Sequence, residues 1–237
     1  QHTTPICSGG YINIVVDGKE KVIKLTRIHL EEDAGKSIHD MDDHVTFLDY
    51  NRAGTPLIEI VTEPDIRSAD EAFAFLTEIR KLVRWIGVCD GNMEEGSLRC
   101  DANISVRQHG DTKLGTRVEV KNLNSVRHVK KAIEIEAKRL IDLVEKGEVV
   151  RQETRSFNAD NDSTFSIRTK EDADDYRYFP EPDLTPFQFK DLFIDEIKQS
   201  LPVLPEQLKE KFITKYGLTE YDASVLCEEQ ELATYFQ

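Results

Sequence analysis

The clearest strand pattern in the chain is Ser97-Leu-Arg-Cys-Asp-Ala-Asn-Ile-Ser-Val-Arg107, in which apolar and polar side chains alternate without a break. Because successive side chains of a strand point to opposite faces of a sheet, this stretch predicts one buried face and one polar face. Residues 116–121 continue the pattern, with Val118 and Val120 on the buried side. We therefore expect a sheet whose two faces differ in chemistry.

Further strands are expected on either side of this sheet. The Asp17-Gly18 pair separates two β-prone runs and is a hairpin signal. The remaining strand candidates are 45–48, 57–61, 149–157 and 164–169.

Two amphipathic helices are predicted between the strands. Ser68 and Glu71 form a capping box that opens a helix over about 68–86, and a second apolar stripe predicts a helix over 125–146. The fold class is therefore α+β, with a largely antiparallel sheet and flanking helices. The composition changes after Pro180-Glu-Pro-Asp183, which places a domain boundary near residue 190. We expect a catalytic domain over 1–190 and the beginning of a helical domain over 191–237.

The composition limits the class of protein. The chain has 237 residues with 39% hydrophobic and 32% charged residues, typical of a globular protein, and neither a membrane span nor a signal peptide is recognisable. A cytoplasmic location is therefore expected. The four cysteines have no metal-ligand or redox spacing and are expected to be reduced packing residues. The net charge of −14 opposes nucleic-acid binding, which would then need a local basic patch, a further segment or basic partners.

Two groups of carboxylates are candidates for a metal site. Glu59 lies in an apolar strand, where an ionised carboxylate needs a metal or a salt bridge to an arginine. Glu31, Glu32 and Asp33 are clustered hard oxygens, which suit Mg²⁺ and also fit a solvated turn at the end of a strand. Strand alternation places Glu31 and Glu32 on opposite faces.

The polar face of the alternating strand is the strongest candidate site. Its arginines can bind phosphate through paired hydrogen bonds, and an Asp–Asn pair can bind a metal ion or a ribose. Lys121, on the neighbouring strand, is expected to join them, although an ordinary exposed face fits the same pattern. The members of this face are Glu95, Ser97, Arg99, Asp101, Asn103 and Arg107. No phosphate-binding glycine loop or hydrolase motif is present, so bound ATP would lie on a sheet.

Four long motifs follow one another along the chain. They are His29-Leu-Glu-Glu-Asp-Ala-Gly-Lys36, Asp49-Tyr-Asn-Arg-Ala-Gly-Thr-Pro-Leu-Ile-Glu-Ile60, Met93-Glu-Glu-Gly-Ser-Leu-Arg-Cys-Asp-Ala-Asn103 and Lys170-Glu-Asp-Ala-Asp-Asp-Tyr-Arg-Tyr-Phe-Pro-Glu-Pro-Asp183. Together they resemble the GatB family, the B subunits of the aspartyl/glutamyl-tRNA amidotransferase, over essentially the whole chain. The resemblance implies a cradle domain related in fold to glutamine synthetase, followed by a helical domain.

The resemblance also implies an activity, a ligase that forms carbon–nitrogen bonds with glutamine as amido donor. ATP, with Mg²⁺, phosphorylates the side-chain carboxylate of Glu-tRNA(Gln) or Asp-tRNA(Asn), and ammonia then displaces the phosphate. The implied partners are the A subunit, which releases ammonia from glutamine, and the small C subunit, in a heterotrimer. The roles implied by position are metal ligation by Glu31, Glu32, Glu59 and Asp101, catalysis by Glu32, Arg99 and Lys121, and nucleotide binding by Ser97, Arg99, Asn103 and Lys121.

The chain departs from the family pattern at both ends. A segment with a Glu-x-His strand and a C-terminal tail domain that contacts tRNA have no counterpart here. We therefore expect a fragment with little or no activity by itself. Two other interpretations remain open: a free-standing ATP-dependent carboxylate–amine ligase, and a non-catalytic module that presents tRNA to a partner.

Overall fold

The computed structural model describes residues 5–39, 41–42, 44–169 and 188–237. The chain divides into two compact units, Gln1–Arg67 and Ser68–Gln237, which are considered separately. The fourth family motif, 170–183, and the composition change at Pro180 lie outside the described residues.

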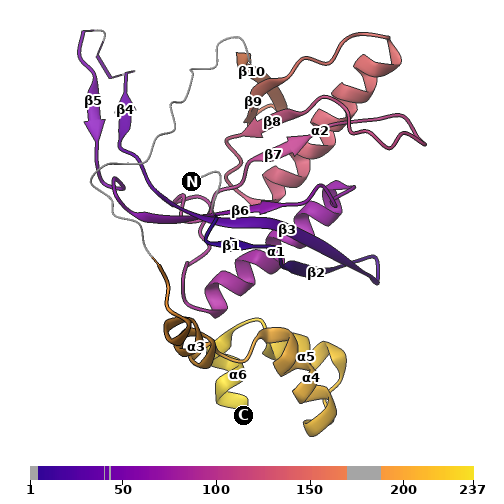
Figure 1. The fold of residues 1–237 in the computed structure, drawn as a ribbon. Coiled ribbons are helices and arrows are strands. Elements are labelled where there is room, and N and C mark those ends of the chain that lie inside the picture. Colours follow the sequence, from indigo (N-terminus) through magenta and orange to yellow (C-terminus); the bar gives the residue numbers. More distant parts are fainter. Residues whose placement is uncertain (1–4, 40, 43, 170–187) are drawn as a thin grey trace. The chain divides into compact units, whose positions relative to one another are not determined.

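The first unit is a small antiparallel sheet with a separate two-stranded ribbon. The predicted hairpin is confirmed, since Asp17 and Gly18 both adopt positive φ angles, 51° and 72°, as its tight turn requires. The long third strand pairs with the second strand and, farther along its length, with the first and sixth strands; the fourth and fifth strands pair with each other (Figure 1). The strands are β1 (Cys7–Ser8), β2 (Tyr11–Val16), β3 (Lys19–Glu32), β4 (Lys36–Ile38), β5 (Phe47–Asp49) and β6 (Pro56–Thr62).

The second unit contains the other sheet and its two long helices. Helix α1 (Ala69–Trp85) begins at Ser68, whose side chain accepts a hydrogen bond from the backbone N–H of Glu71 as the capping box predicts. Helix α2 (Val126–Glu145) is capped in the same way by Ser125. The sheet runs in the order β10-β9-β8-β7, with one parallel pairing between β8 and β9 and antiparallel pairing elsewhere. Its strands are β7 (Ala102–Ile104), β8 (Val118–Lys121), β9 (Glu153–Asn158) and β10 (Ser163–Thr169).

The predicted strand at 97–107 is wrong in length, because only β7 joins a ladder. The preceding residues form turns around Asn92, whose backbone carbonyl accepts hydrogen bonds from the N–H groups of Ser97 and Leu98. These local bonds satisfy the backbone without a neighbouring strand. Covered and exposed side chains nevertheless alternate from Leu98 to Ile104. The pattern therefore predicted correctly which face each of these side chains takes, but it predicted too long a stretch of strand pairing.

The C-terminal helices share a core with α1. The indole Nε1 of Trp85 donates a hydrogen bond of 2.9 Å to the carbonyl of Val203, and Trp85 packs with Phe212 and Cys227. The α+β prediction is confirmed, while a boundary near residue 190 stays a prediction. No helix among the described residues is both long and apolar enough to cross a membrane. The helices are α3 (Asp191–Ser200), α4 (Pro205–Tyr216), α5 (Glu220–Leu226) and α6 (Gln230–Phe236).

Candidate functional site

The predicted site residues fall into both units. Glu31, Glu32 and Glu59 belong to the first, on β3 and β6. The site residues assigned roles on the polar sheet face belong to the second; they are Ser97, Arg99, Asp101, Asn103 and Lys121.

In the first unit, the β3–β6 register decides which carboxylates share a face. Glu59 lies directly opposite His29, and Glu31 lies opposite Leu57, so Glu31 and Glu59 are diagonal neighbours on one face. Glu32 lies opposite Pro56 and points to the other face, as strand alternation predicts. The ladder thus presents two of the three predicted glutamates together.

The structure gives some support to each interpretation of these carboxylates: a metal site, a salt bridge to an arginine and a solvated turn. Glu59 is joined to an arginine, with 3.4 Å between its Oε1 and the Arg27 guanidinium, but 44% of its side chain is exposed. Asp33 is structural: its carboxylate pairs with Arg52 at 2.7 Å and its backbone bonds to Thr55 and Gly54. The acidic trio therefore separates into one structural aspartate and two glutamates on opposite faces.

The donor set on the shared face is suited to a hard cation. Glu31 and Glu59 offer carboxylate oxygens, and Mg²⁺ typically takes few protein carboxylates plus water and phosphate oxygens. Beside them, Nδ1 of His29 is buried and has no hydrogen-bond partner among the described residues. No group of three or more His, Cys, Asp or Glu in the described ranges is arranged to hold a metal by itself. A cation here would thus depend on ligands from substrate and solvent.

In the second unit, four polar residues are joined in a chain that we call the Lys121 network. Lys121 Nζ lies 2.6 Å from Asp101 Oδ2 and 3.5 Å from Glu119 Oε1, and the Thr154 hydroxyl donates to Glu119 Oε2 at 3.0 Å. The strand neighbours of this chain are buried valines, Val118 and Val120, on the opposite face. The network, comprising Asp101, Glu119, Lys121 and Thr154, therefore lies on the polar face that the alternation predicts.

The other residues predicted for this face divide into two groups. Asn103 lies directly opposite Glu119 in the β7–β8 ladder and belongs to the face. Ser97 and Arg99 precede the sheet: the Ser97 hydroxyl donates to Asp90, and the Arg99 Nε donates to the carbonyl of Gly96. A strand placement is therefore wrong for Ser97 and Arg99, and also for Glu95 and Arg107, which lie outside β7.

The environment of the Lys121 network favours a protonated lysine. Burial would lower the pKa of Lys121, but the hydrogen bond and charge of Asp101 and the charge of Glu119 outweigh burial, so the pKa is raised. On the opposite side of the same segment, burial, helped by the charge of Asp101, raises the pKa of the Cys100 thiol to about 12. The lysine is thus a permanent cation at neutral pH, and the cysteine is an inert packing residue.

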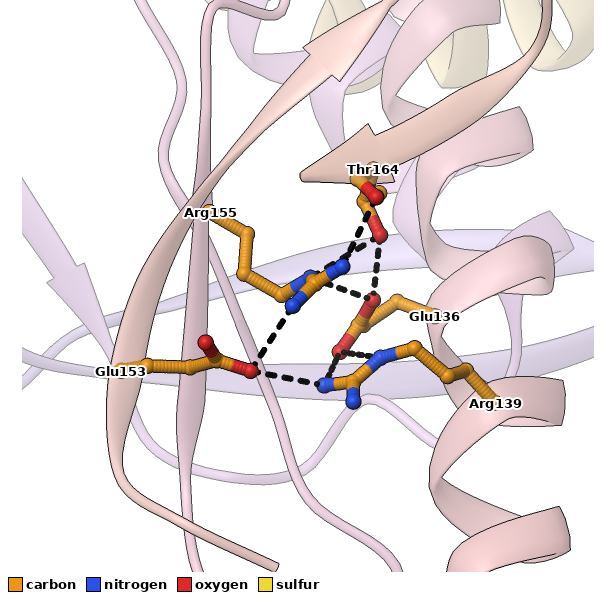
Figure 2. A network of polar contacts seen from close by, with 5 residues as sticks. All are labelled: Glu136, Arg139, Glu153, Arg155 and Thr164. Atoms are coloured by element: carbon orange, nitrogen blue, oxygen red, sulfur yellow. Dashed lines mark hydrogen bonds and ion pairs between the residues drawn. The ribbon is translucent and has the colours of Figure 1, made fainter. Parts of the chain in front are cut away.

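A second polar network, absent from the sequence-based expectations, lies between α2 and the sheet (Figure 2). Glu136 is fully buried; its carboxylate accepts from Arg139 Nε at 2.9 Å and from the Thr164 hydroxyl at 2.8 Å. Arg155 donates to Glu153 at 2.9 Å and to the Thr164 carbonyl at 2.7 Å. We call these five residues, Glu136, Arg139, Glu153, Arg155 and Thr164, the Glu136 network. Its one sequence signal is a glutamate four residues before Leu140, inside the apolar stripe of α2.

The basic residues of α2 are largely paired with carboxylates. Lys130 pairs with Asp70 on α1, and Lys131 pairs with Asp162 in the turn between β9 and β10. Arg139 belongs to the Glu136 network. Because these three cations already have carboxylate partners, they are less available to bind phosphate groups.

Comparison with known families adds independent information. Residues 1–195 match the model of the GatB/GatE catalytic domain. This range includes both the β3–β6 face and the Lys121 network. Both groups of predicted site residues therefore belong to the part of the chain that the family shares.

Individual relatives agree with the family match. The B subunit of the aspartyl/glutamyl-tRNA(Asn/Gln) amidotransferase of Rickettsia bellii is 55% identical over 98% of this chain and 48% of its own length. The proteins of the same name from Thermodesulfovibrio yellowstonii and Chlorobium phaeobacteroides are 51% and 54% identical over the whole chain and 50% of their own lengths. The chain thus spans about half the length of these relatives.

Proposed function

This chain belongs to the GatB/GatE catalytic-domain family, and on that premise we propose that it carries the phosphate-transfer and amidation site of a tRNA-dependent amidotransferase. The substrate is the side-chain carboxylate of a glutamyl or aspartyl group esterified to tRNA. ATP phosphorylates this carboxylate, and ammonia converts it to the amide. The relatives' name supports this class of substrate, since they are B subunits of the aspartyl/glutamyl-tRNA amidotransferase.

The Lys121 network is the observation that carries the proposal. Phosphoryl transfer spreads negative charge over the γ-phosphate oxygens, so its site needs a fixed cation. Lys121 provides one, because Asp101 and Glu119 raise its pKa and restrict its position. Its side chain remains 45% exposed, which leaves room for a phosphate oxygen.

The proposed chemistry has two steps. A carboxylate oxygen of the substrate attacks the γ-phosphorus, the bond to the β,γ-bridging oxygen breaks, and ADP leaves. The nitrogen of ammonia then attacks the acyl carbon, the carbon–oxygen bond to phosphate breaks, and inorganic phosphate leaves as the nitrogen loses a proton. Lys121 and Arg99 bind the phosphate, and Ser97 and Asn103 orient it. When bound, Mg²⁺ neutralises phosphate charge. Within the first unit, Glu31 and Glu59 would hold it, and Glu32, on the other face of the strand, is proposed as a ligand and as a catalytic residue. Asp101 is proposed as a ligand within the second unit.

The remaining features of the proposal concern assembly. Ammonia comes from glutamine hydrolysed by the A subunit, and the small C subunit completes a cytoplasmic heterotrimer that acts without a membrane. The relatives are themselves named as one subunit of an amidotransferase, which supports a complex with other subunits.

The direct test is amidation by the assembled amidotransferase that contains this chain. Ammonium replaces glutamine as nitrogen donor, so that the assay is independent of the glutaminase. Lys121→Met is expected to lower kcat by about 10²–10³-fold, the typical effect of removing one charge-stabilising donor. Lys113→Met is the matched control, because Lys113 is exposed in a loop of the same unit and is expected to leave kcat unchanged.

Three outcomes would contradict the proposal. Full amidation by Lys121→Met would remove the proposed role of the network. Turnover of free glutamate or aspartate without tRNA would indicate a free-standing ligase. Loss of tRNA affinity without loss of the chemical step would indicate a presenting module.

A further inference from the structure

Thr154 is the member of the Lys121 network that lies two contacts away from the cation. It belongs to β9, which is next to β8 in the sheet (Figure 1). Its hydroxyl donates a hydrogen bond of 3.0 Å to Oε2 of Glu119, and the other oxygen of that carboxylate, Oε1, lies 3.5 Å from Lys121 Nζ. One glutamate therefore connects the hydroxyl to the lysine.

The ladder registers explain why a short side chain can reach this glutamate. Glu119 lies opposite Asn103 in the antiparallel β7–β8 ladder and opposite Thr154 in the parallel β8–β9 ladder. Side chains that are opposite each other on neighbouring strands share a face and are close enough to interact. Lys121 lies on the same face, two residues farther along β8. Glu119 is thus held between a partner on the next strand and a partner on its own strand.

The Thr154 hydroxyl restrains a side chain that would otherwise be free to rotate. The Glu119 side chain is 31% exposed, and holding a long, half-exposed side chain in one geometry costs conformational entropy. The hydrogen bond to Oε2 fixes the carboxylate with Oε1 directed at Lys121. Threonine suits this task, because its branched Cβ restricts the rotation that positions the hydroxyl.

The Lys121 ammonium is in turn held from two directions. Asp101 contacts it at 2.6 Å from the segment that enters β7, and Glu119 contacts it at 3.5 Å from β8 itself. Stabilisation of a charged transition state depends on charges that are in place before the reaction. Without a fixed Glu119, a single carboxylate would hold the flexible lysine, and the position of its charge would vary more.

We propose that Thr154 is a positioning residue for phosphate transfer, acting through Glu119 to hold the Lys121 ammonium against the γ-phosphate. The inference rests on the proposed function, which assigns phosphate binding to Lys121. In this role the Thr154 side chain contacts Glu119 and not the substrate. Its hydroxyl is therefore required for full activity, whereas its methyl group is not.

Ammonium-driven amidation by the assembled amidotransferase tests this role with two substitutions of one residue. Thr154→Val keeps the shape and removes the hydroxyl; it is expected to lower kcat about three- to tenfold, with the KM for ATP within about twofold of wild type. Thr154→Ser keeps the hydroxyl and is expected to restore kcat to within about twofold of wild type. Thr116→Val is the matched control, because Thr116 is exposed in the segment before β8 and should leave kcat unchanged.

A double-mutant cycle shows whether Thr154 acts through Glu119. In a Glu119→Ala background, Thr154→Val is expected to lower kcat no further, because the group through which Thr154 acts is already absent. A further threefold loss in that background would mean that Thr154 contacts the substrate directly and would overturn the proposal. If Glu119→Ala has no measurable turnover, the comparison of Thr154→Val with Thr154→Ser decides.

Other outcomes would also overturn the positioning role. Wild-type kcat in Thr154→Val would do so, and so would equal losses in Thr154→Val and Thr154→Ser. A merely structural role would lower the urea midpoint of Thr154→Val and leave the kcat of the folded enzyme unchanged. Lys121→Met in the same assay separates this inference from the proposed function. Full activity of Lys121→Met would refute both, whereas an impaired Lys121→Met beside an unaffected Thr154→Val would refute the positioning role alone.

Discussion

The two polar networks of the second unit have similar components and opposite surroundings. The Glu136 network lies between α2 and the sheet, and its central carboxylate is fully buried and bonded through both oxygens. The Lys121 network lies on the other face, where the side chains of Lys121 and Asp101 are 45% and 46% exposed. The first is closed to solvent, whereas the second is open to it. Burial, rather than residue type, distinguishes a structural network from a candidate site.

The largest expected effect breaks the Glu136 network. Glu136→Ala removes the partner of two arginines in a buried site and should lower the free energy of unfolding by roughly 3–5 kcal/mol. Glu134→Ala, on the exposed side of α2, is the control and should change it by less than about 0.5 kcal/mol. Urea denaturation measures both. A loss below about 1 kcal/mol for Glu136→Ala would show that the network is dispensable for folding.

Replacing Lys121 should have the opposite pair of effects, a small loss of stability and a large loss of amidation activity. Its ion pairs are half-exposed, so Lys121→Met should cost less than about 1 kcal/mol of stability although it removes the proposed phosphate-binding cation. Urea denaturation gives the free energy of unfolding of the same preparation whose amidation rate is measured, so that the two losses can be compared. A large loss of stability would place Lys121 among the structural residues and contradict the contrast between the networks.

Asp101→Asn tests whether Asp101 acts through Lys121 or as a metal ligand. Loss of a charge-assisted hydrogen bond should lower kcat on the order of tenfold. Because Asp101 raises the pKa of Lys121, the variant should move the alkaline limb of the pH–rate profile to lower pH. An unchanged alkaline limb together with weaker Mg²⁺ activation would instead identify Asp101 as a metal ligand.

Sequence patterns predicted much of this fold and a smaller part of the site. Asp17-Gly18 and the Ser68 cap act locally, so the hairpin and helix α1 could be read directly. The alternation from Leu98 onward predicted which face each side chain takes, but not which residues pair with a neighbouring strand. It contains no information on the turns around Asn92 that hold Ser97 and Arg99 outside the sheet. The Glu136 network was missed because its partners are brought together only by the packing of α2 on β9 and β10.

Acid should weaken the Glu136 network by protonating Glu153. Burial alone would raise the pKa of Glu153, but hydrogen bonds from Ser166 and Arg155 and the charges of Arg155 and Arg139 prevail and lower it. A lowered pKa contributes stability above the carboxylate's unfolded value, and this contribution is lost as pH falls through the folded value. Glu153→Gln should therefore flatten the decline in stability below pH 4.5, the ordinary pKa of a glutamate side chain, as measured by thermal unfolding across pH. An equally steep decline in the variant would assign the acid sensitivity to other carboxylates.

The smallest effect concerns the thiols. Cys100 has a raised pKa of about 12, which leaves on the order of one thiolate in ten thousand at pH 8. Cys7 is exposed and should react first with iodoacetamide in the folded protein, as followed by mass spectrometry of peptides. Early labelling of Cys100 would mean that the covered side of the 98–104 segment is open to solvent.

The most direct test of a phosphate-transfer site at the Lys121 network is positional isotope exchange in ATP. The assembled enzyme is incubated with ATP labelled at the β,γ-bridging oxygen and with acylated tRNA, in the absence of ammonia. Reversible phosphorylation of the substrate carboxylate lets the bridging oxygen scramble into a non-bridging β-position. We expect exchange that depends on acylated tRNA, persists in Lys113→Met and falls about 10²-fold or more in Lys121→Met. Undiminished exchange in Lys121→Met would contradict the assignment.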